Sequence, residues 1–269
     1  MFATRLLTVA LALPLFLAAL FLLPRTGWVW CLLPALLLGA HEWGALVGYA
    51  RRGAWIYAAV TTAVAAVLAY LGHAEGAPPS PPLAAAYAIG AAFWLLIAPF
   101  WLRAQWRVRG LALAVTGWIV LLPMWLALVE LQSIAAVLLA FLGVVWIADT
   151  AAYLAGRQWG KHKLAPSISP GKTWEGVAGA VAGVFLYYVL LQAFVDDPHP
   201  ALSGAQGGVL FAVLLALSIE GDLFESWIKR QAGVKDSGRL LPGHGGVLDR
   251  IDGLTATLPV VALYVHYLR

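Results

Sequence analysis

Long apolar runs separated by short polar segments follow one another along the whole chain. A membrane-spanning helix needs about 20 mostly apolar residues, and strands of membrane barrels are about half as long. The length of the runs therefore predicts helices, and nine runs qualify as candidate spans. With soft boundaries, the expected spans are residues 6–23, 28–50, 54–71, 82–102, 111–129, 134–155, 174–195, 207–228 and 254–268.

Composition supports a membrane protein. Hydrophobic residues make up 62% of the 269-residue chain and charged residues only 11%, with a mean hydropathy of +0.84. A soluble domain carries about 25% charged residues, so a soluble globular domain, a disordered chain and a coiled coil are excluded. The single cysteine, Cys31, excludes an intrachain disulfide. We expect an all-α integral membrane protein, a polytopic helical bundle of about nine transmembrane helices.

The basic residues predict the orientation. If nine helices alternate in direction, 15 of the 17 basic residues fall on the side of the N-terminus, and only Arg25 and Arg269 fall on the other. The positive-inside rule makes the basic side cytoplasmic. We therefore expect a cytoplasmic N-terminus and an outward C-terminus. The 15 residues are Arg5, Arg51, Arg52, Arg103, Arg107, Arg109, Arg157, Lys161, Lys163, Lys172, Lys229, Arg230, Lys235, Arg239 and Arg250.

The acidic residues divide the chain into two regions. Residues 1–130 are N-terminal transmembrane helices, and residues 131–269 form a C-terminal region with cytoplasmic loops at 156–173 and 229–253. Acids within spans are costly and usually face a cavity or a partner. A network of ion pairs locking helix ends is one interpretation, and a polar catalytic or transport cavity is the other. Eight of the 13 acids lie near the cytoplasmic ends of the last four helices: Asp149, Glu175, Glu220, Asp222, Glu225, Asp236, Asp249 and Asp252.

The two C-terminal loops carry the residue types of a phosphate site. Lysines, arginines and a glycine-rich turn suit a phosphate group, since glycine lets backbone N–H groups approach an anion. Aspartates in the same segment suit divalent cations that bridge phosphates. Thr173 is a plausible helix N-cap with Glu175 in the first turn, which would place Lys172 at a helix N-terminus that favours an anion. The alternative makes Lys172 one more cation of a positive-inside loop.

These loops resemble the phosphatidate cytidylyltransferases, also called CDP-diacylglycerol synthases. The family signature matches at every defined position from Ser226 to Asp252, through Lys229-Arg230, Lys235-Asp236, Gly238, Leu241-Pro242, His244-Gly245-Gly246-Val247 and Asp249-Arg250-Ile251. The segment from Ser169 to Gly176 resembles the family's second block. Asp149-Thr150 with Gly156-Arg157 resembles the block before it, with Ala151 where the family has glycine.

The resemblance implies a reaction and a set of roles. Phosphatidate in the cytoplasmic leaflet of the inner membrane attacks the α-phosphorus of CTP, pyrophosphate leaves and CDP-diacylglycerol forms, without nucleic acid. Mg²⁺ is the implied cofactor, a second cation and a homodimer being left open. The implied metal ligands are Asp222, Asp249 and Asp252. The implied catalytic residues are these three with Lys235, Asp236 and His244. The implied substrate-binding residues are Lys172, Ser226, Lys229, Arg230, Arg239, Gly245, Gly246 and Arg250.

Two rivals remain at this point. Another metal-dependent membrane transferase acting on a lipid or polyprenyl phosphate would use the same metal and phosphate chemistry. An ion-coupled transporter would place acids deep in several spans or in broken helices near the midplane. Here the acids gather at one surface beside a basic loop, which disfavours the transporter. In the first half, His41 and Glu42 lie within a span and are expected to be structural.

Overall fold

The protein is almost entirely helical. A computed structural model describes residues 2–72, 80–195, 199–238 and 245–268. The helices and strands are α1 (Phe2–Leu22), α2 (Arg25–Val47), α3 (Arg51–Gly72), α4 (Pro81–Ala92), η1 (Phe93–Ile97), α5 (Ala98–Ala104), α6 (Gly110–Glu130), η2 (Leu131–Ile134), α7 (Ala135–Trp159), β1 (Lys163–Ala165), β2 (Ser169–Thr173), α8 (Trp174–Phe194), η3 (Pro200–Leu202), α9 (Gly204–Gln231), α10 (Leu248–Leu263) and η4 (Tyr264–Leu268).

The polytopic membrane fold is confirmed, whereas the number of crossings stays a prediction. Helices cover each of the nine expected spans. Within the described ranges, six helical stretches are long and apolar enough to cross a membrane. One of the six, Gly110–Trp159, runs through α6, η2 and α7. α10 has only 16 residues.

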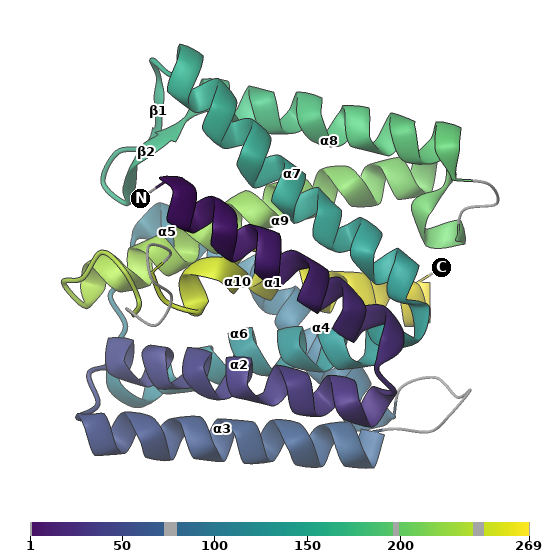
Figure 1. Cartoon of the computed structure of the whole chain (residues 1–269). Coiled ribbons are helices and arrows are strands. Elements are labelled where there is room, and N and C mark those ends of the chain that lie inside the picture. Colours follow the sequence, from purple (N-terminus) through teal and green to yellow (C-terminus); the bar gives the residue numbers. More distant parts are fainter. Residues whose placement is uncertain (1, 73–79, 196–198, 239–244, 269) are drawn as a thin grey trace.

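The helices lie side by side in layers, with α10 in the middle (Figure 1). α2 packs on α3, and α7 packs on α8. Between these pairs, α10 contacts α9, α6 and α4, and touches α2 and α7. α10 is buried over most of its length, from Gly253 to Ala262. α10 is therefore enclosed by the bundle, and the first turn of this helix lies among the ends of other helices.

Aromatic side chains of α2 and α3 fasten these helices to α6. The Trp43 indole N–H donates to the carbonyl of Leu113 at 3.0 Å, and the Tyr57 hydroxyl donates to the carbonyl of Ala114 at 2.8 Å. A Cβ on Gly117 would collide with both rings, so glycine is required where they approach α6. Both hydrogen bonds satisfy polar groups buried inside an apolar bundle, where leaving them unpaired is costly.

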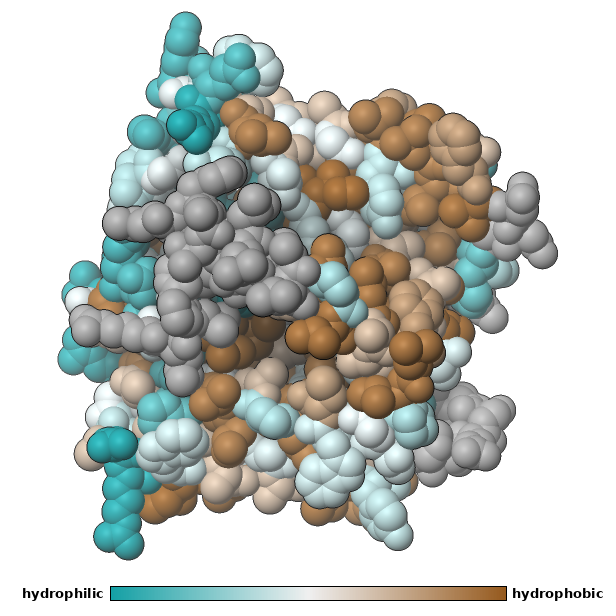
Figure 2. Space-filling view, in the orientation of Figure 1, coloured by the Kyte–Doolittle hydropathy of each residue, from teal (hydrophilic) through white to brown (hydrophobic). Residues whose placement is uncertain are grey.

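Polar residues gather at one end of the bundle. Figure 2 shows them along the edge where β1, β2 and the neighbouring helix ends lie in Figure 1, and brown apolar surface covers much of the rest of this face. α1 begins toward the polar end, and η4 ends toward the opposite end (Figure 1). This arrangement agrees with the predicted segregation of basic residues, and the two termini point to opposite ends.

A small hairpin interrupts the helices between α7 and α8. β1 and β2 pair antiparallel within the loop 156–173, with Lys163 opposite Thr173 and Ala165 opposite Ser169. A few backbone hydrogen bonds therefore give this loop a fixed shape. β2 leads directly into α8 and carries Lys172, so the hairpin determines where that lysine lies.

Candidate active site

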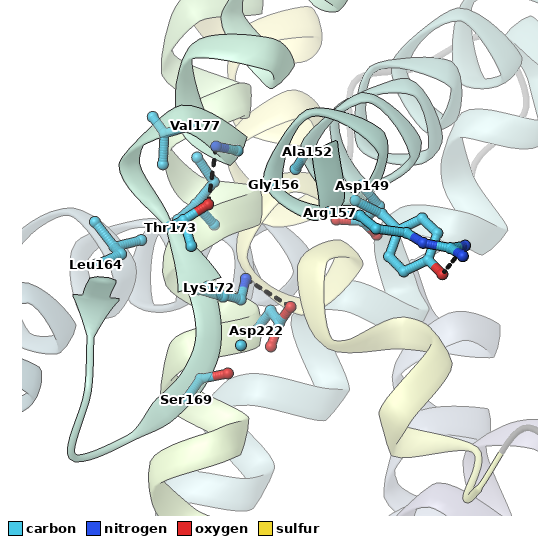
Figure 3. A pocket seen from close by; sticks show the side chains of 14 residues that line it. Asp149, Ala152, Gly156, Arg157, Leu164, Ser169, Lys172, Thr173, Val177 and Asp222 are labelled. Atoms are coloured by element: carbon cyan, nitrogen blue, oxygen red, sulfur yellow. Dashed lines mark hydrogen bonds and ion pairs between the residues drawn. The ribbon is translucent and has the colours of Figure 1, made fainter. Parts of the chain in front are cut away.

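A pocket at the polar end lies between the hairpin and the ends of α7, α8 and α9. Its volume is about 460 Å³. Figure 3 shows Asp149, Lys172 and Asp222 around it, with Arg157 and Ser169. Asp149 comes from α7, Lys172 from β2 and Asp222 from α9. The structure thus brings Lys172, of the loop 156–173, beside two of the acids singled out by the sequence.

An ion pair joins β2 to α9 beside this pocket. The Lys172 ammonium lies 2.6 Å from Asp222 Oδ2, with 22% of the Lys172 side chain and 32% of the Asp222 side chain exposed (Figure 3). Ser226, one turn further along α9, donates its hydroxyl to Asp222 Oδ1 at 3.3 Å. Asp222 therefore has one oxygen facing a cation and the other facing a hydroxyl, and both lie beside the pocket.

The predicted helix cap positions Lys172. α8 begins at Trp174, and the Thr173 hydroxyl accepts the backbone N–H of Gly176 at 3.1 Å. This confirms Thr173 as the N-cap and Glu175 as a first-turn acid. Glu175 also binds the Nδ1 of His162 at 2.6 Å, which ties the hairpin to the helix. Lys172 consequently stands at the positive end of the α8 dipole, where an anion is stabilised.

A second charged cluster is buried next to the pocket. Lys229 lies 3.1 Å from Glu225 Oε2 and also pairs with Asp249, and each of the three side chains is at most 9% exposed. Charges buried this deeply must be paired. The pairing joins the last turn of α9 to the first turn of α10. Two carboxylates hold the Lys229 ammonium in this structure, and its substrate-binding role stays a prediction.

Asp249 holds the loop between α9 and α10. Its Oδ2 accepts the backbone N–H groups of Ser237 at 3.1 Å and Gly246 at 2.8 Å, together with the Ser237 hydroxyl at 3.1 Å. Asp249 precedes the expected span 254–268. Burial raises the pKa of its carboxyl, but Lys229 and the Gly246 and Ser237 N–H groups hold it below its ordinary value. The carboxylate is therefore kept ionised by its neighbours.

Gly245 and Gly246 lie against this carboxylate. Gly245 has a φ of +83°, a conformation that side chains rarely adopt, and a Cβ there would meet Asp249 Oδ2 at 2.6 Å. Glycine is required at this position because the backbone turns tightly over the carboxylate. The turn is thus arranged around Asp249, and any direct contact of the two glycines with substrate stays a prediction.

Carboxylates outnumber nearby cations in the centre of the site. Asp252 is within electrostatic range of Asp149, Asp222 and Glu225. One oxygen of Glu225 is buried without a hydrogen-bond partner in the described part of the chain. Oxygen donors and surplus negative charge suit a hard divalent cation. The donor set therefore fits Mg²⁺ by chemistry, although no three Asp, Glu, His or Cys side chains among the described residues already form a metal-binding group.

Glu42 is more important to the candidate active site than the sequence indicated. It lies within α2, is 3% exposed, and accepts the backbone N–H groups of Val247 at 3.0 Å and Leu248 at 2.9 Å, and the Ser237 hydroxyl at 2.8 Å. Glu42 thus caps the start of α10 from another helix. The expectation of a structural role agrees with these contacts, but its target, the candidate active site, was not foreseen. An acid within an apolar span was the only signal in the sequence.

The remaining predicted residues are exposed, face away from the buried cluster, or lie outside the described residues. Lys235, Asp236 and Arg250 are exposed. Arg250 is within electrostatic range of Asp149. Arg230 faces away from the buried cluster, donating to the carbonyls of Ile168 at 3.2 Å and Val234 at 3.0 Å. Two predicted residues, Arg239 and His244, lie outside the described residues.

The chain is similar to known proteins over almost its whole length. The model of the Cytidylyltransferase family matches residues 3–268. A phosphatidate cytidylyltransferase of Pseudomonas aeruginosa is 38% identical over 276 aligned positions, which cover 97% of this chain and 96% of that protein. Phosphatidate cytidylyltransferases of Haemophilus influenzae and Staphylococcus epidermidis are 48% and 47% identical, each over under half of either chain (46% and 43%; 48% and 48%). By the extent of these matches, the chain belongs to the cytidylyltransferase family.

Proposed function

We propose that this protein transfers the cytidylyl group of CTP to phosphatidate and releases pyrophosphate. A phosphate oxygen of the lipid forms a bond to the α-phosphorus of CTP, and the bond from that phosphorus to the bridging oxygen of pyrophosphate breaks. The observation that carries the proposal is the Lys172–Asp222 pair beside a pocket at the polar end of a membrane bundle. Such a pocket is open to a soluble nucleotide and adjoins the bilayer that holds the lipid.

The cations of the site would bind and orient the phosphates. Lys172 stands at the N-terminus of α8 with part of its side chain exposed to the pocket, so a phosphate can take the place of Asp222 as its partner. Arg157 and Arg250 lie close enough to the pocket acids to contact the other charges of a triphosphate. Little covalent chemistry is required of the protein, so rate comes from holding phosphorus and oxygen in line and from stabilising charge.

Asp222, Asp249 and Asp252 are the proposed ligands of Mg²⁺, with Asp149 and Glu225 close to them. When bound, Mg²⁺ would neutralise charge on the phosphate oxygens. Ser226 and Lys172 orient the Asp222 carboxylate, and Lys229 with Gly246 and Ser237 orients that of Asp249. The lipid phosphate is already ionised near neutral pH, so the mechanism needs no strong general base.

The same assignments imply how the protein is oriented in the membrane. The basic end of the bundle would face the cytoplasm, where CTP is found, and the membrane would be the bacterial inner membrane. The 15-to-2 distribution of basic residues and the bacterial relatives support this placement.

A label-transfer assay tests the function. The full chain in micelles containing phosphatidate is given CTP labelled at the α- or the γ-phosphorus. We expect the α-label in the lipid product and the γ-label in pyrophosphate, with Asp222→Asn abolishing both and Arg52→Gln, an exposed cation at the start of α3, leaving them unchanged. Transfer of label to a polyprenyl phosphate, or from other nucleotides in preference to CTP, would instead favour the rival membrane transferase.

A further inference from the structure

A second, smaller pocket at the polar end is lined by three arginines. Its volume is about 200 Å³, and it shares no lining residue with the larger pocket. Arg107 and Arg109 come from the loop between α5 and α6, and Arg230 comes from the end of α9. Ser167, from the turn between β1 and β2, completes one wall. The proposed reaction leaves this pocket unexplained.

Hydrogen bonds between three segments fix the shape of the pocket. The backbone N–H of Val108 donates to Gln231 Oε1 at 3.0 Å, and the Trp227 indole donates to the carbonyl of Trp106 at 3.0 Å. Gln105 donates to the Ser167 hydroxyl at 2.6 Å. The loop is therefore fastened to both α9 and the hairpin turn, and the arginines project from a braced backbone.

The pocket is rich in donors: besides Arg107 and Arg109 it holds Arg230, whose guanidinium donates to the backbone carbonyls of Ile168 and Val234. In the described ranges, none of its three arginines forms an ion pair with an acid, unlike Lys172 and Lys229 in the active site. The Gln231 side-chain amide nitrogen is buried and has no hydrogen-bond partner among the described residues. A buried donor left unpaired is costly, so the missing partner is an acceptor. Three guanidinium groups line the same pocket, and their positive charge favours an anion as that acceptor.

The position of the pocket indicates which anion. The loop carrying Arg107 and Arg109 joins two candidate membrane spans. The first span ends at Ala104, and the second begins at Gly110. Trp106, in the middle of the loop, is 46% exposed, and Phe100 in the preceding turn is 65% exposed. Exposed tryptophan at a span end is typical of the membrane interface, where lipid headgroups lie. Planar guanidinium groups match the oxygens of phosphate in pairs.

We propose that the pocket of Arg107, Arg109 and Arg230 binds the phosphate of an anionic phospholipid headgroup in the cytoplasmic leaflet. The Gln231 amide donates to the same phosphate, and the acyl chains lie against the exposed apolar side chains of η1 and α5. A lipid bound at this site lies next to the reaction centre but does not enter the larger pocket. The binding site does not rest on the proposed reaction, and only the choice of leaflet rests on the proposed orientation.

Lipid-dependent thermal stability of the full chain tests the site. The melting temperature is measured in phosphatidylcholine–detergent micelles with increasing phosphatidylglycerol, which carries a headgroup phosphate but is not the proposed substrate. The test variant is Arg107→Gln/Arg109→Gln. The matched control is Arg51→Gln/Arg52→Gln, which removes two exposed charges from the start of α3. Inorganic phosphate and pyrophosphate, added without phosphatidylglycerol, form the soluble arm.

We expect phosphatidylglycerol to stabilise the wild type and the control equally. The apparent Kd should rise by roughly tenfold or more in the test variant, since bonds to charged groups are lost. The proposed site would be overturned if phosphatidylglycerol binding weakened equally in the test and control variants, or if phosphatidylglycerol did not stabilise the wild type. An equal effect of soluble phosphate that depends on Arg107 and Arg109 would overturn the lipid assignment. If the test variant fails to fold, Arg107→Lys/Arg109→Lys replaces it, and wild-type affinity there would refute the guanidinium–phosphate pairing.

Discussion

Glu42 makes the strongest single prediction, because one side chain in the first half of the chain holds the start of α10. The variant is Glu42→Ala. It removes a carboxylate that accepts two backbone N–H groups and a hydroxyl, all at distances of 3.0 Å or less, from a position that is 3% exposed.

The magnitude follows from the number and type of bonds. A hydrogen bond to a charged group contributes about 1.5–3 kcal/mol, and bonds that fail together do not add in full. Each buried donor left without an acceptor costs about 1–3 kcal/mol, so with three donors affected together we expect a loss of stability of about 3–5 kcal/mol. Asp249 and Asp252 lie in the first two turns of α10. A displacement of about 1 Å at a catalytic group can cost on the order of 100-fold in rate, so kcat/KM should fall by about that factor.

The assay combines thermal unfolding with CTP-dependent turnover in phosphatidate micelles. Glu42→Gln is the conservative companion: it keeps one acceptor oxygen but turns an NH₂ toward N–H donors, so it should fall between the wild type and Glu42→Ala. Glu130→Gln is the control, because Glu130 pairs with Arg25 at 2.9 Å at the other end of α2 and its side chain is 12% exposed. Near wild-type stability and turnover for Glu42→Ala would refute the capping argument.

Further predictions concern the active site and the topology. Asp222→Ala and Asp249→Ala should each abolish turnover while the protein still inserts; near wild-type activity at saturating Mg²⁺ would remove that residue from the proposed ligands. Lys172→Met should lower kcat/KM by roughly ten- to more than a hundredfold, and Lys172→Arg should restore it only in part, whereas a merely positive-inside lysine would leave both variants active. Lys235→Met should behave like Lys172→Met if Lys235 contacts CTP, and turnover at limiting CTP measures it. Labelling of cysteines introduced near each terminus should place the two termini on opposite sides of the membrane.

Local features of the fold could be predicted from the sequence. The apolar runs predicted where helices lie, because an apolar run of that length has few other stable arrangements. Thr173 as the N-cap of α8 was predictable because the capping contact spans only three residues. The pairing of β1 with β2 was not, since strands of three and five residues with Pro170 and Gly171 carry little periodicity.

The contacts of the candidate site were harder to foresee. The sequence placed Lys172 and Asp222 in one site, but their direct pairing depends on how α8 and α9 pack. The contact of Glu42 with Leu248 joins residues 206 positions apart, and no local pattern encodes it. Local signals thus predict elements and residue types, whereas the partners of each charge depend on tertiary packing.

The enclosed position of α10 also constrains how the protein is made. α10 comes after α4, α6 and α9 in the chain, and it fills a space bordered by these three helices. Until it arrives, Glu42 lacks the N–H groups of Val247 and Leu248, and Lys229 lacks Asp249. A nascent chain halted before residue 248 therefore leaves Glu42 and Lys229 without these partners. The charged cluster of Glu225, Lys229 and Asp249 forms only once α10 has been synthesised.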